Sequence, residues 1–139
     1  MNYRITGTGS CIPDITKKNS DFLENKFLDT DGGKFQTSNS EIIDKFNSIT
    51  GIYERRYAPD EINCSDLAAV AADLAINDSK LDQETLDYII VAHNTGDISC
   101  SSGQVDTLPS VASKVKAKLK IKNPNCVAYD IICGCPGWV

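Results

Sequence analysis

The chain has 139 residues, of which 41% are hydrophobic and 24% are charged, the composition of a globular protein with one ordinary domain. Its formal net charge of -5 argues against nucleic acid as a partner, because a phosphate backbone is bound mainly through Lys and Arg. The N-terminus lacks a signal-peptide core, and no stretch approaches the ~20 apolar residues that cross a bilayer. We therefore expect a cytoplasmic chain with no membrane partner.

The first half of the chain predicts a strand, a helix and a short extended arm. Residues 3–12 are expected to form the opening strand. Ser38, followed by Glu41 three residues later, predicts the start of a helix by a capping box, and Gly51 predicts its end. The expected apolar face of this helix comprises Ile42, Ile43, Phe46 and Ile49. Residues 52–57 are then expected to form a short strand or an extended arm.

The second half predicts helices that alternate with buried strands. Ser65 is expected to open a helix, and the β-branched run 86–93 predicts a strand buried on both faces. Pro109 is expected in the first turn of a further helix, and residues 126–132 predict another strand. The two apolar helix stripes are expected to be Leu67, Val70, Ala71 and Leu74, and Val111, Val115 and Leu119. This alternation predicts an α/β fold with a mainly parallel sheet.

Cysteine is frequent for a chain of this kind. The six residues are Cys11, Cys64, Cys100, Cys126, Cys133 and Cys135. We expect free, mostly buried thiols, because no export signal accompanies them and unpaired Cys packs as a small hydrophobe. The only histidine, His93, has no ligand-spaced partner, and no C-x-x-C pair occurs, so no metal site is expected. His93 is better explained as a hydrogen-bonded histidine at a strand end than as a general base.

The most informative stretch follows the last predicted strand. There, Cys133, Gly134, Cys135, Pro136 and Gly137 form a turn of mostly small residues at a strand-to-helix corner. Such a corner can expose a nucleophile to a pocket, and a helix N-terminus favours the thiolate. Cys135 is therefore the candidate nucleophile. From local sequence alone, a buried and inert cysteine at a tight corner is about equally well supported.

Lysines recur along residues 114–122, on and after the predicted third helix. This run could dock an acidic carrier protein. A solvated helix face is the more common explanation of such a charge run.

Four ordered stretches resemble the β-ketoacyl-acyl-carrier-protein synthase III family. Residues 5–10 look like the family's opening strand, and residues 49–56 carry its TGI-x-ER signature. Residues 81–92 look like its second core strand and the approach to it. Residues 130–137 fit its active-site pattern D-[IL]-x-x-x-C-x-G, in which Cys135 takes the place of the nucleophile. The four stretches span nearly the whole chain.

The resemblance implies a thiolase-like α/β fold, of which residues 1–139 would be the N-terminal half of a five-layered αβαβα condensing enzyme. It implies that Cys135 accepts an acyl group, and that a malonyl group carried by acyl carrier protein then decarboxylates and condenses with it. The backbone N–H of Cys135 would be one oxyanion donor. The family completes its site with a His and an Asn from a second half, so we expect this half to be inactive alone. A homodimer and no cofactor are also implied.

Three positions bear on the substrates that the resemblance implies. Synthases that use a coenzyme A primer carry a Trp and an Arg where this chain has Lys45 and Ile49. An acyl-coenzyme A primer is therefore in doubt, and a carrier-bound primer is more plausible. Leu108 matches the place where the family lines the acyl pocket of the neighbouring subunit. An ordinary packing residue at a helix entry is the alternative for Leu108.

Two other functions stay open. Thiolases, hydroxymethylglutaryl-coenzyme A synthases and chalcone synthases share the cysteine corner and differ in their second catalytic residues. A non-catalytic thiolase-like partner subunit is the second alternative, although such subunits typically lack the cysteine. Neither alternative changes the expected fold.

Overall fold

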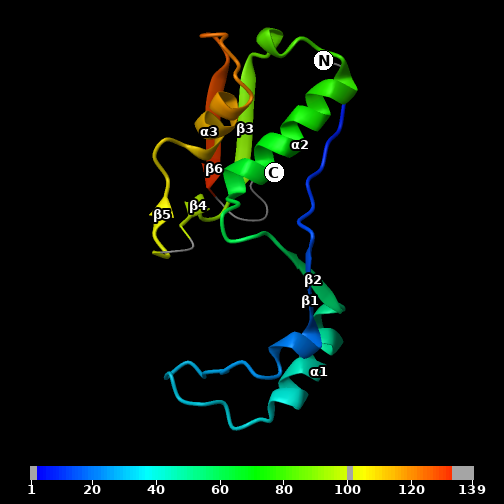
Figure 1. Cartoon of the computed structure of the whole chain (residues 1–139), viewed down its shortest axis with the longest axis vertical. Coiled ribbons are helices and arrows are strands. Elements are labelled where there is room, and N and C mark those ends of the chain that lie inside the picture. Colours follow the sequence, from blue (N-terminus) through cyan, green and yellow to red (C-terminus); the bar gives the residue numbers. More distant parts are fainter. Residues whose placement is uncertain (1–2, 100–101, 133–139) are drawn as a thin grey trace. The chain divides into compact units, whose positions relative to one another are not determined.

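The computed structural model describes residues 3–99 and 102–132. The chain divides into two compact units, which are considered separately: Pro13–Pro59, and Met1–Ile12 together with Asp60–Val139. Figure 1 shows the elements of each unit. No helix within the described ranges is long and apolar enough to span a membrane.

The unit Pro13–Pro59 consists of a strand pair and a helix. Strand β1 (Ile15–Lys18) pairs antiparallel with β2 (Glu54–Tyr57), which confirms the predicted short strand in residues 52–57. A 3-10 turn, η1 (Asn19–Phe22), follows β1. Helix α1 (Asn39–Thr50) is the longest element of this unit.

Helix α1 begins and ends where its sequence predicts. The Ser38 hydroxyl accepts a hydrogen bond from the Glu41 backbone N–H at 3.3 Å, which satisfies one of the free amides of the first turn. Gly51 ends the helix in the left-handed region at φ 67°, a conformation that costs glycine little. Ile43 is buried, as expected, whereas Ile49 is 79% exposed, so the predicted apolar face is only partly covered.

The other unit contains a parallel strand pair and two α-helices. Its elements are α2 (Cys64–Ser79), η2 (Gln83–Thr85), β3 (Tyr88–His93), β4 (Asp97–Ile98), β5 (Val105–Asp106), α3 (Val111–Lys118) and β6 (Val127–Ile132). Strands β3 and β6 are parallel, and β4 and β5 form a short antiparallel pair. The predicted strands at 86–93 and 126–132 and the helix after Pro109 are therefore confirmed.

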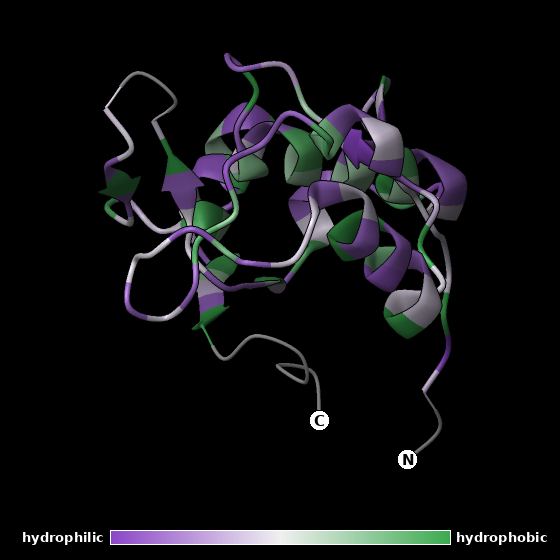
Figure 2. Cartoon of the chain, turned by 90° about the horizontal axis from the view of Figure 1, so that it is seen from below, coloured by the Kyte–Doolittle hydropathy of each residue, from purple (hydrophilic) through white to green (hydrophobic). Residues whose placement is uncertain are grey.

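The core of this unit lies between α2, α3 and one face of the β3–β6 pair. Val111 and Val115 on α3 are fully covered, and Ala69 on α2 packs against them. Ile89 and Val91 on β3 complete the cluster from the strand side. Figure 2 shows that hydrophobic and hydrophilic residues are interspersed along the helices, which is typical of helices with one buried face.

The expected core positions are wrong for two of the four residues on α2 and for one face of β3. Val70 and Leu74 are 49% and 46% exposed, because the face of α2 turned to α3 is the one that carries Ala69. The other face of the β3–β6 pair is open, where Tyr88 stacks on Tyr129 with ring centroids 6.1 Å apart and both rings are exposed. The two strands are thus not buried on both faces.

Residues 3–12 are extended but do not form the expected strand. They lie against α2 instead: the Thr8 N–H donates to the Asp78 carboxylate at 2.9 Å. Only glycine permits this approach, because a Cβ on Gly9 would stand 2.2 Å from the Ala71 carbonyl oxygen and one on Gly7 would lie 2.4 Å from the Ala75 carbonyl oxygen.

Two smaller expectations also change. Pro109 precedes the N-cap residue Ser110 and is not in the first turn of α3. Of the three strand pairs in the described part of the chain, only β3–β6 is parallel, so a mainly parallel sheet is not what the structure shows.

Candidate active site

The candidate site lies where β3 and β6 end beside the start of α3. Because the two strands are parallel, their carboxyl ends meet at one edge, where His93 is in register with Ile132. Asp130, two residues before the end of β6, accepts hydrogen bonds from the first two amides of α3: Val111 N–H to Oδ2 and Ala112 N–H to Oδ1, both at 2.7 Å. A carboxylate from a strand thus occupies the positive end of a helix.

His93 gives this carboxylate a third partner. Its Nε2 lies 3.0 Å from Asp130 Oδ2, and its Nδ1 lies 2.9 Å from the backbone nitrogen of Gly96. Since the Gly96 N–H can only donate, Nδ1 accepts and Nε2 carries the proton that is donated to Asp130. The imidazole is therefore a neutral ring held in one tautomer, with 5% of its side chain exposed. This confirms the expectation of a hydrogen-bonded histidine at a strand end.

The surroundings of Asp130 favour its charged form. Burial by itself would raise the pKa of this carboxyl, but the hydrogen bonds from Ala112, His93 and Val111 outweigh it and lower the pKa below its usual value. Asp130 is thus an anion held by three donors.

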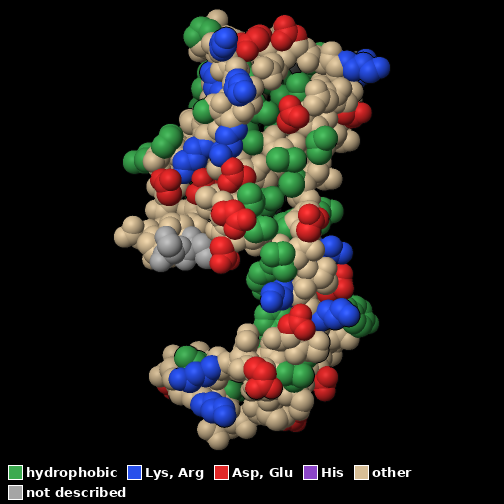
Figure 3. All heavy atoms as spheres, viewed as in Figure 1, with side chains coloured by type: hydrophobic (Ala, Val, Ile, Leu, Met, Phe, Trp, Pro, Cys, Tyr) green, Lys and Arg blue, Asp and Glu red, His purple; other side chains and the backbone are tan. Residues whose placement is uncertain are grey.

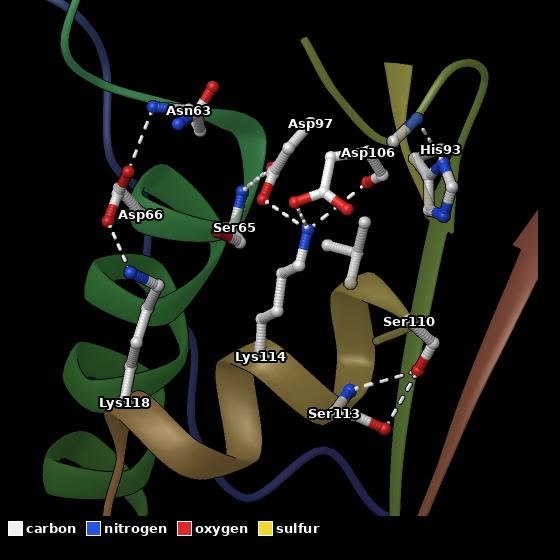
Figure 4. A network of polar contacts seen from close by, with 12 residues as sticks. Asn63, Ser65, Asp66, His93, Asp97, Asp106, Ser110, Ser113, Lys114 and Lys118 are labelled. Atoms are coloured by element: carbon white, nitrogen blue, oxygen red, sulfur yellow. Dashed lines mark hydrogen bonds and ion pairs between the residues drawn. The ribbon is translucent and has the colours of Figure 1, made fainter. Parts of the chain in front are cut away.

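A second buried carboxylate, Asp97 on β4, is held in a similar way (Figure 4). Its Oδ1 accepts from the Ser65 N–H near the start of α2 at 2.8 Å, and its Oδ2 lies 3.1 Å from Lys114 Nζ. Lys114 also contacts the Asp106 carboxylate at 2.9 Å and the Asp106 carbonyl at 3.1 Å. Burial would raise the pKa of Asp97, but the Ser65 and Lys114 hydrogen bonds lower it overall. This cluster ties β4, β5, α2 and α3 together.

No sequence pattern predicts the Asp97–Lys114 cluster, because its members come from four separate elements. Of the lysine run, Lys116 Nζ donates to the Asn123 and Cys126 carbonyls, and Lys118 Nζ contacts Asp66 at 2.6 Å. Lys114, Lys116 and Lys118 therefore hold the fold together and do not form a purely solvated face.

The thiol of Cys64 lies at the start of α2 near both carboxylates. Burial raises its pKa, and the charges of Asp97 and Asp130 raise it further. A thiol in this setting stays protonated and is a poor nucleophile. Cys11, Cys64 and Cys126 are free thiols, as expected, but only Cys126 of these three is buried, so the expectation of mostly buried thiols is wrong for the other two.

Cys135, the predicted nucleophile, lies outside the described residues, as do Cys133 and Pro136. Leu108, the predicted pocket residue, follows β5 and is 84% exposed. No group of three His, Cys, Asp or Glu residues in 3–99 and 102–132 could hold a metal ion.

The TGI-x-ER signature lies in the unit Pro13–Pro59, where its residues connect α1 to β2. The Thr50 hydroxyl donates to the Phe46 carbonyl and accepts from the Ile52 N–H at 3.1 Å. Arg55 donates to Asn19 Oδ1 at 2.7 Å, and its guanidinium lies over the Phe46 ring at 5.7 Å. The signature thus has a physical role in this chain: it ends the helix and orders the turn that follows.

The two positions that bear on the primer, Lys45 and Ile49, line one apolar hollow in the same unit. Its volume is about 400 Å³, and its walls come from α1 and the segment before it. Apart from these two residues it is lined by Phe27, Leu28, Phe35, Thr37, Ile42, Phe46 and Thr50.

Comparison with known proteins tests the family resemblance of the whole chain. No family model matches the chain. The β-ketoacyl-[acyl-carrier-protein] synthase III 1 of Vibrio parahaemolyticus is 37% identical over all 139 residues, and synthase III 2 of Vibrio cholerae is 36% identical over 135 residues. The resemblance to the β-ketoacyl-acyl-carrier-protein synthase III family is confirmed. The chain spans 37% and 30% of the lengths of these two relatives.

Solved structures of such synthases have the same fold. The 3-oxoacyl-[acyl-carrier-protein] synthase III of Aquifex aeolicus superimposes with a TM-score of 0.68 at 31% identity, over 98% of this chain and 36% of that one. A 3-oxoacyl-(acyl-carrier protein) synthase of Burkholderia xenovorans gives a TM-score of 0.73 at 23% identity, over 97% of this chain and 33% of that one, which shows the fold alone. The predicted thiolase-like α/β fold class is confirmed.

Proposed function

We propose that this chain is the N-terminal, nucleophile-bearing half of a condensing enzyme of the β-ketoacyl-acyl-carrier-protein synthase III type, with Cys135 as the acyl-accepting residue. The observation that carries the proposal is identity of 35–37% over all 139 residues to synthases of this name. The site geometry supports it, because the strand that leads to Cys135 is anchored to a neighbouring strand and to a helix N-terminus.

The chemistry needs a thiolate that is both a nucleophile and a good leaving group. The Cys135 thiolate attacks the carbonyl of a primer thioester, the bond to the carrier sulfur breaks, and the carrier thiolate leaves. A malonyl group on acyl carrier protein then loses CO₂. Its carbanion attacks the acyl-enzyme, releases the Cys135 thiolate and yields a 3-oxoacyl product. No metal or cofactor enters these steps.

The completed enzyme would need groups that this sequence does not supply. We propose that a His and an Asn from a second half of the protein stabilise the developing charges, and that the protein acts as a homodimer. The 84% exposure of Leu108 is in keeping with a side chain that reaches the acyl pocket of a neighbouring subunit. Lys45 and Ile49 favour a primer bound to acyl carrier protein over one bound to coenzyme A.

The test is the intact mass of the complete gene product after exposure to acyl-carrier thioesters and, separately, to acyl-coenzyme A. We expect an acyl adduct on the wild type and on Cys133→Ala, the matched control two residues away, and none on Cys135→Ala. The donor that reacts identifies the primer. The absence of any adduct on folded protein would contradict the proposal and favour a non-catalytic partner subunit.

A further inference from the structure

The apolar hollow of the unit Pro13–Pro59 has no role in the acyl-transfer steps above. Its volume of about 400 Å³ falls within the range of about 300–1,000 Å³ that is typical of small-molecule sites. One wall is a stripe of helix α1 that runs from Ile42 through Phe46 to Ile49. Residues at this spacing lie on one face of a helix, and the stripe extends over about 10 Å of the helix axis. This wall is therefore both apolar and elongated.

The other wall comes from residues 27–37, in the loop that leaves η1 and returns to the start of α1 (Figure 1). The Phe35 N–H donates to the Phe27 carbonyl at 3.1 Å, which closes this segment on itself. The Phe27 ring packs edge to face against Phe46 of α1, with ring centroids 5.8 Å apart. Leu28 and Phe35 nevertheless stay 49% and 46% exposed. The two walls are thus in contact at Phe46, and they leave apolar surface uncovered between them.

A single positive charge belongs to this hollow. Lys45 lies on the same stripe of α1, and it is the only charged residue among the described residues that line the hollow. No residue in the described ranges forms an ion pair with Lys45. A ligand with an apolar body and one negative charge is complementary to this lining, because its body covers the walls and its charge lies beside the ammonium. A nucleotide is not complementary, since its phosphates and polar base would meet one cation and mostly apolar walls.

We propose that the apolar hollow binds a medium-chain fatty acid, with its hydrocarbon chain along the α1 stripe and its carboxylate beside Lys45. An extended chain matches the elongated wall better than a compact ring system does. Each methylene that leaves water contributes to affinity, and the single carboxylate has one cation as its partner. The proposal concerns reversible binding alone, so it does not depend on acyl transfer at Cys135.

The test is calorimetric titration of the complete gene product with sodium decanoate, sodium octanoate and 1-decanol. We expect octanoate to bind about tenfold more weakly than decanoate, because it buries two fewer methylenes. We expect 1-decanol, which has the chain of decanoate without its charge, to bind about fivefold more weakly, since an exposed ion pair contributes modestly. Hydrogen exchange locates the site: decanoate should slow amide exchange in residues 27–37 and in α1.

Two lysine substitutions separate the charge of the site from its apolar walls. Lys45→Met keeps most of the side-chain stem and removes the ammonium, so we expect about fivefold weaker binding of decanoate and unchanged binding of 1-decanol. Lys17→Met is the matched control, because Lys17 is an exposed lysine on β1 of the same unit and does not line the hollow. It should bind both ligands as the wild type does. Since Lys45 is exposed, neither substitution is expected to impair folding.

Three results would overturn the inference. The first is the absence of binding, or protection from exchange that is confined to other parts of the protein. The second is Lys45→Met binding decanoate as tightly as Lys17→Met does. The third is displacement of decanoate from residues 27–37 and α1 by coenzyme A at similar concentration, which would assign the hollow to a nucleotide. Because these measurements need no acyl transfer, a protein that forms no acyl adduct refutes the proposed function and leaves this test intact.

Discussion

The two compact units of the chain differ in what holds them together. In the unit with α2 and α3, two buried carboxylates each accept hydrogen bonds from helix amides and each has a further polar partner. In the unit Pro13–Pro59, every residue of which the structure describes, Ile43 is the one buried hydrophobic residue. Phe22 and Phe27 pack edge to face against Phe46.

The two units also differ in how well their apolar residues are covered. Val111, Val115 and Ala69 make a covered apolar cluster. The hydrogen bonds of Asp130 and Asp97 connect to α3, the helix that carries two of these residues. In the other unit, Leu28, Phe35 and Ile49 remain 46–79% exposed around an apolar hollow. Hydrophobic side chains also reach the surface among charged ones in Figure 3. We therefore expect the first unit to be rigid at its site and the second to be only marginally stable.

The strongest test of this difference removes the carboxylate at the start of α3. Asp130→Asn cannot accept all three hydrogen bonds, so a buried donor is left without its partner. We expect the free energy of unfolding to fall by about 3 kcal/mol, measured by urea denaturation of the complete gene product. A loss below about 0.5 kcal/mol would show that the network contributes little to this unit.

The apolar cluster is tested by Val115→Ala. Val115 is 1% exposed, and its truncation leaves a cavity that the two helices cannot fully close. We expect a loss of about 2 kcal/mol in the same denaturation experiment. Val70→Ala on α2 is the control, because Val70 is 49% exposed and should cost less than about 0.5 kcal/mol. If Val70→Ala lowered the free energy of unfolding as much as Val115→Ala, the face of α2 that carries Val70 would also be covered in the complete protein.

The buried lysine is tested by Lys114→Met against Lys122→Met. Lys114 pairs with Asp97 and Asp106, whereas Lys122 is exposed. We expect Lys114→Met to cost about 1.5 kcal/mol and Lys122→Met to cost almost nothing. A comparable loss from Lys122→Met would contradict the role assigned to the cluster.

Acid unfolding tests the pH dependence of the two buried carboxylates, Asp97 and Asp130. The folded state lowers the pKa of Asp97 and Asp130 from 3.8, so their stabilisation is present above that value and is lost as the pH falls through the lower folded pKa. Removing Lys114 removes one cause of the shift at Asp97. The acid midpoint of Lys114→Met, followed by circular dichroism, should therefore lie at higher pH than that of wild type, whereas an unchanged midpoint would contradict the assignment.

The smallest change is expected in the other unit. Gly51 ends α1 at φ 67° with open space around its Cα, so Gly51→Ala suffers only the strain of the left-handed conformation. We expect a loss of about 1 kcal/mol, seen as faster amide exchange in α1. Exchange in α3 should not change; if it did, the two units would share one unfolding transition.

Local patterns were enough to predict several elements. Ser38 and Gly51 bound α1 because capping and left-handed glycine act within a few residues. The apolar runs at β3 and β6 are also local patterns, and they predict both strands from a few consecutive residues. Four ordered stretches together resemble the family, and 37% identity over the 139 residues of this chain confirms that resemblance.

Tertiary structure decided everything that depends on contacts between distant residues. The buried face of α2 could not be read from its sequence, since an Ala-rich helix offers more than one apolar stripe, and packing against Val111 and Val115 selected the one with Ala69. Residues 3–12 lie against a helix because Gly7 and Gly9 allow a close approach that no local rule foresees. His93 and Asp130 meet only because two parallel strands share a register, and hydrogen bonds across such a register depend on the fold as a whole.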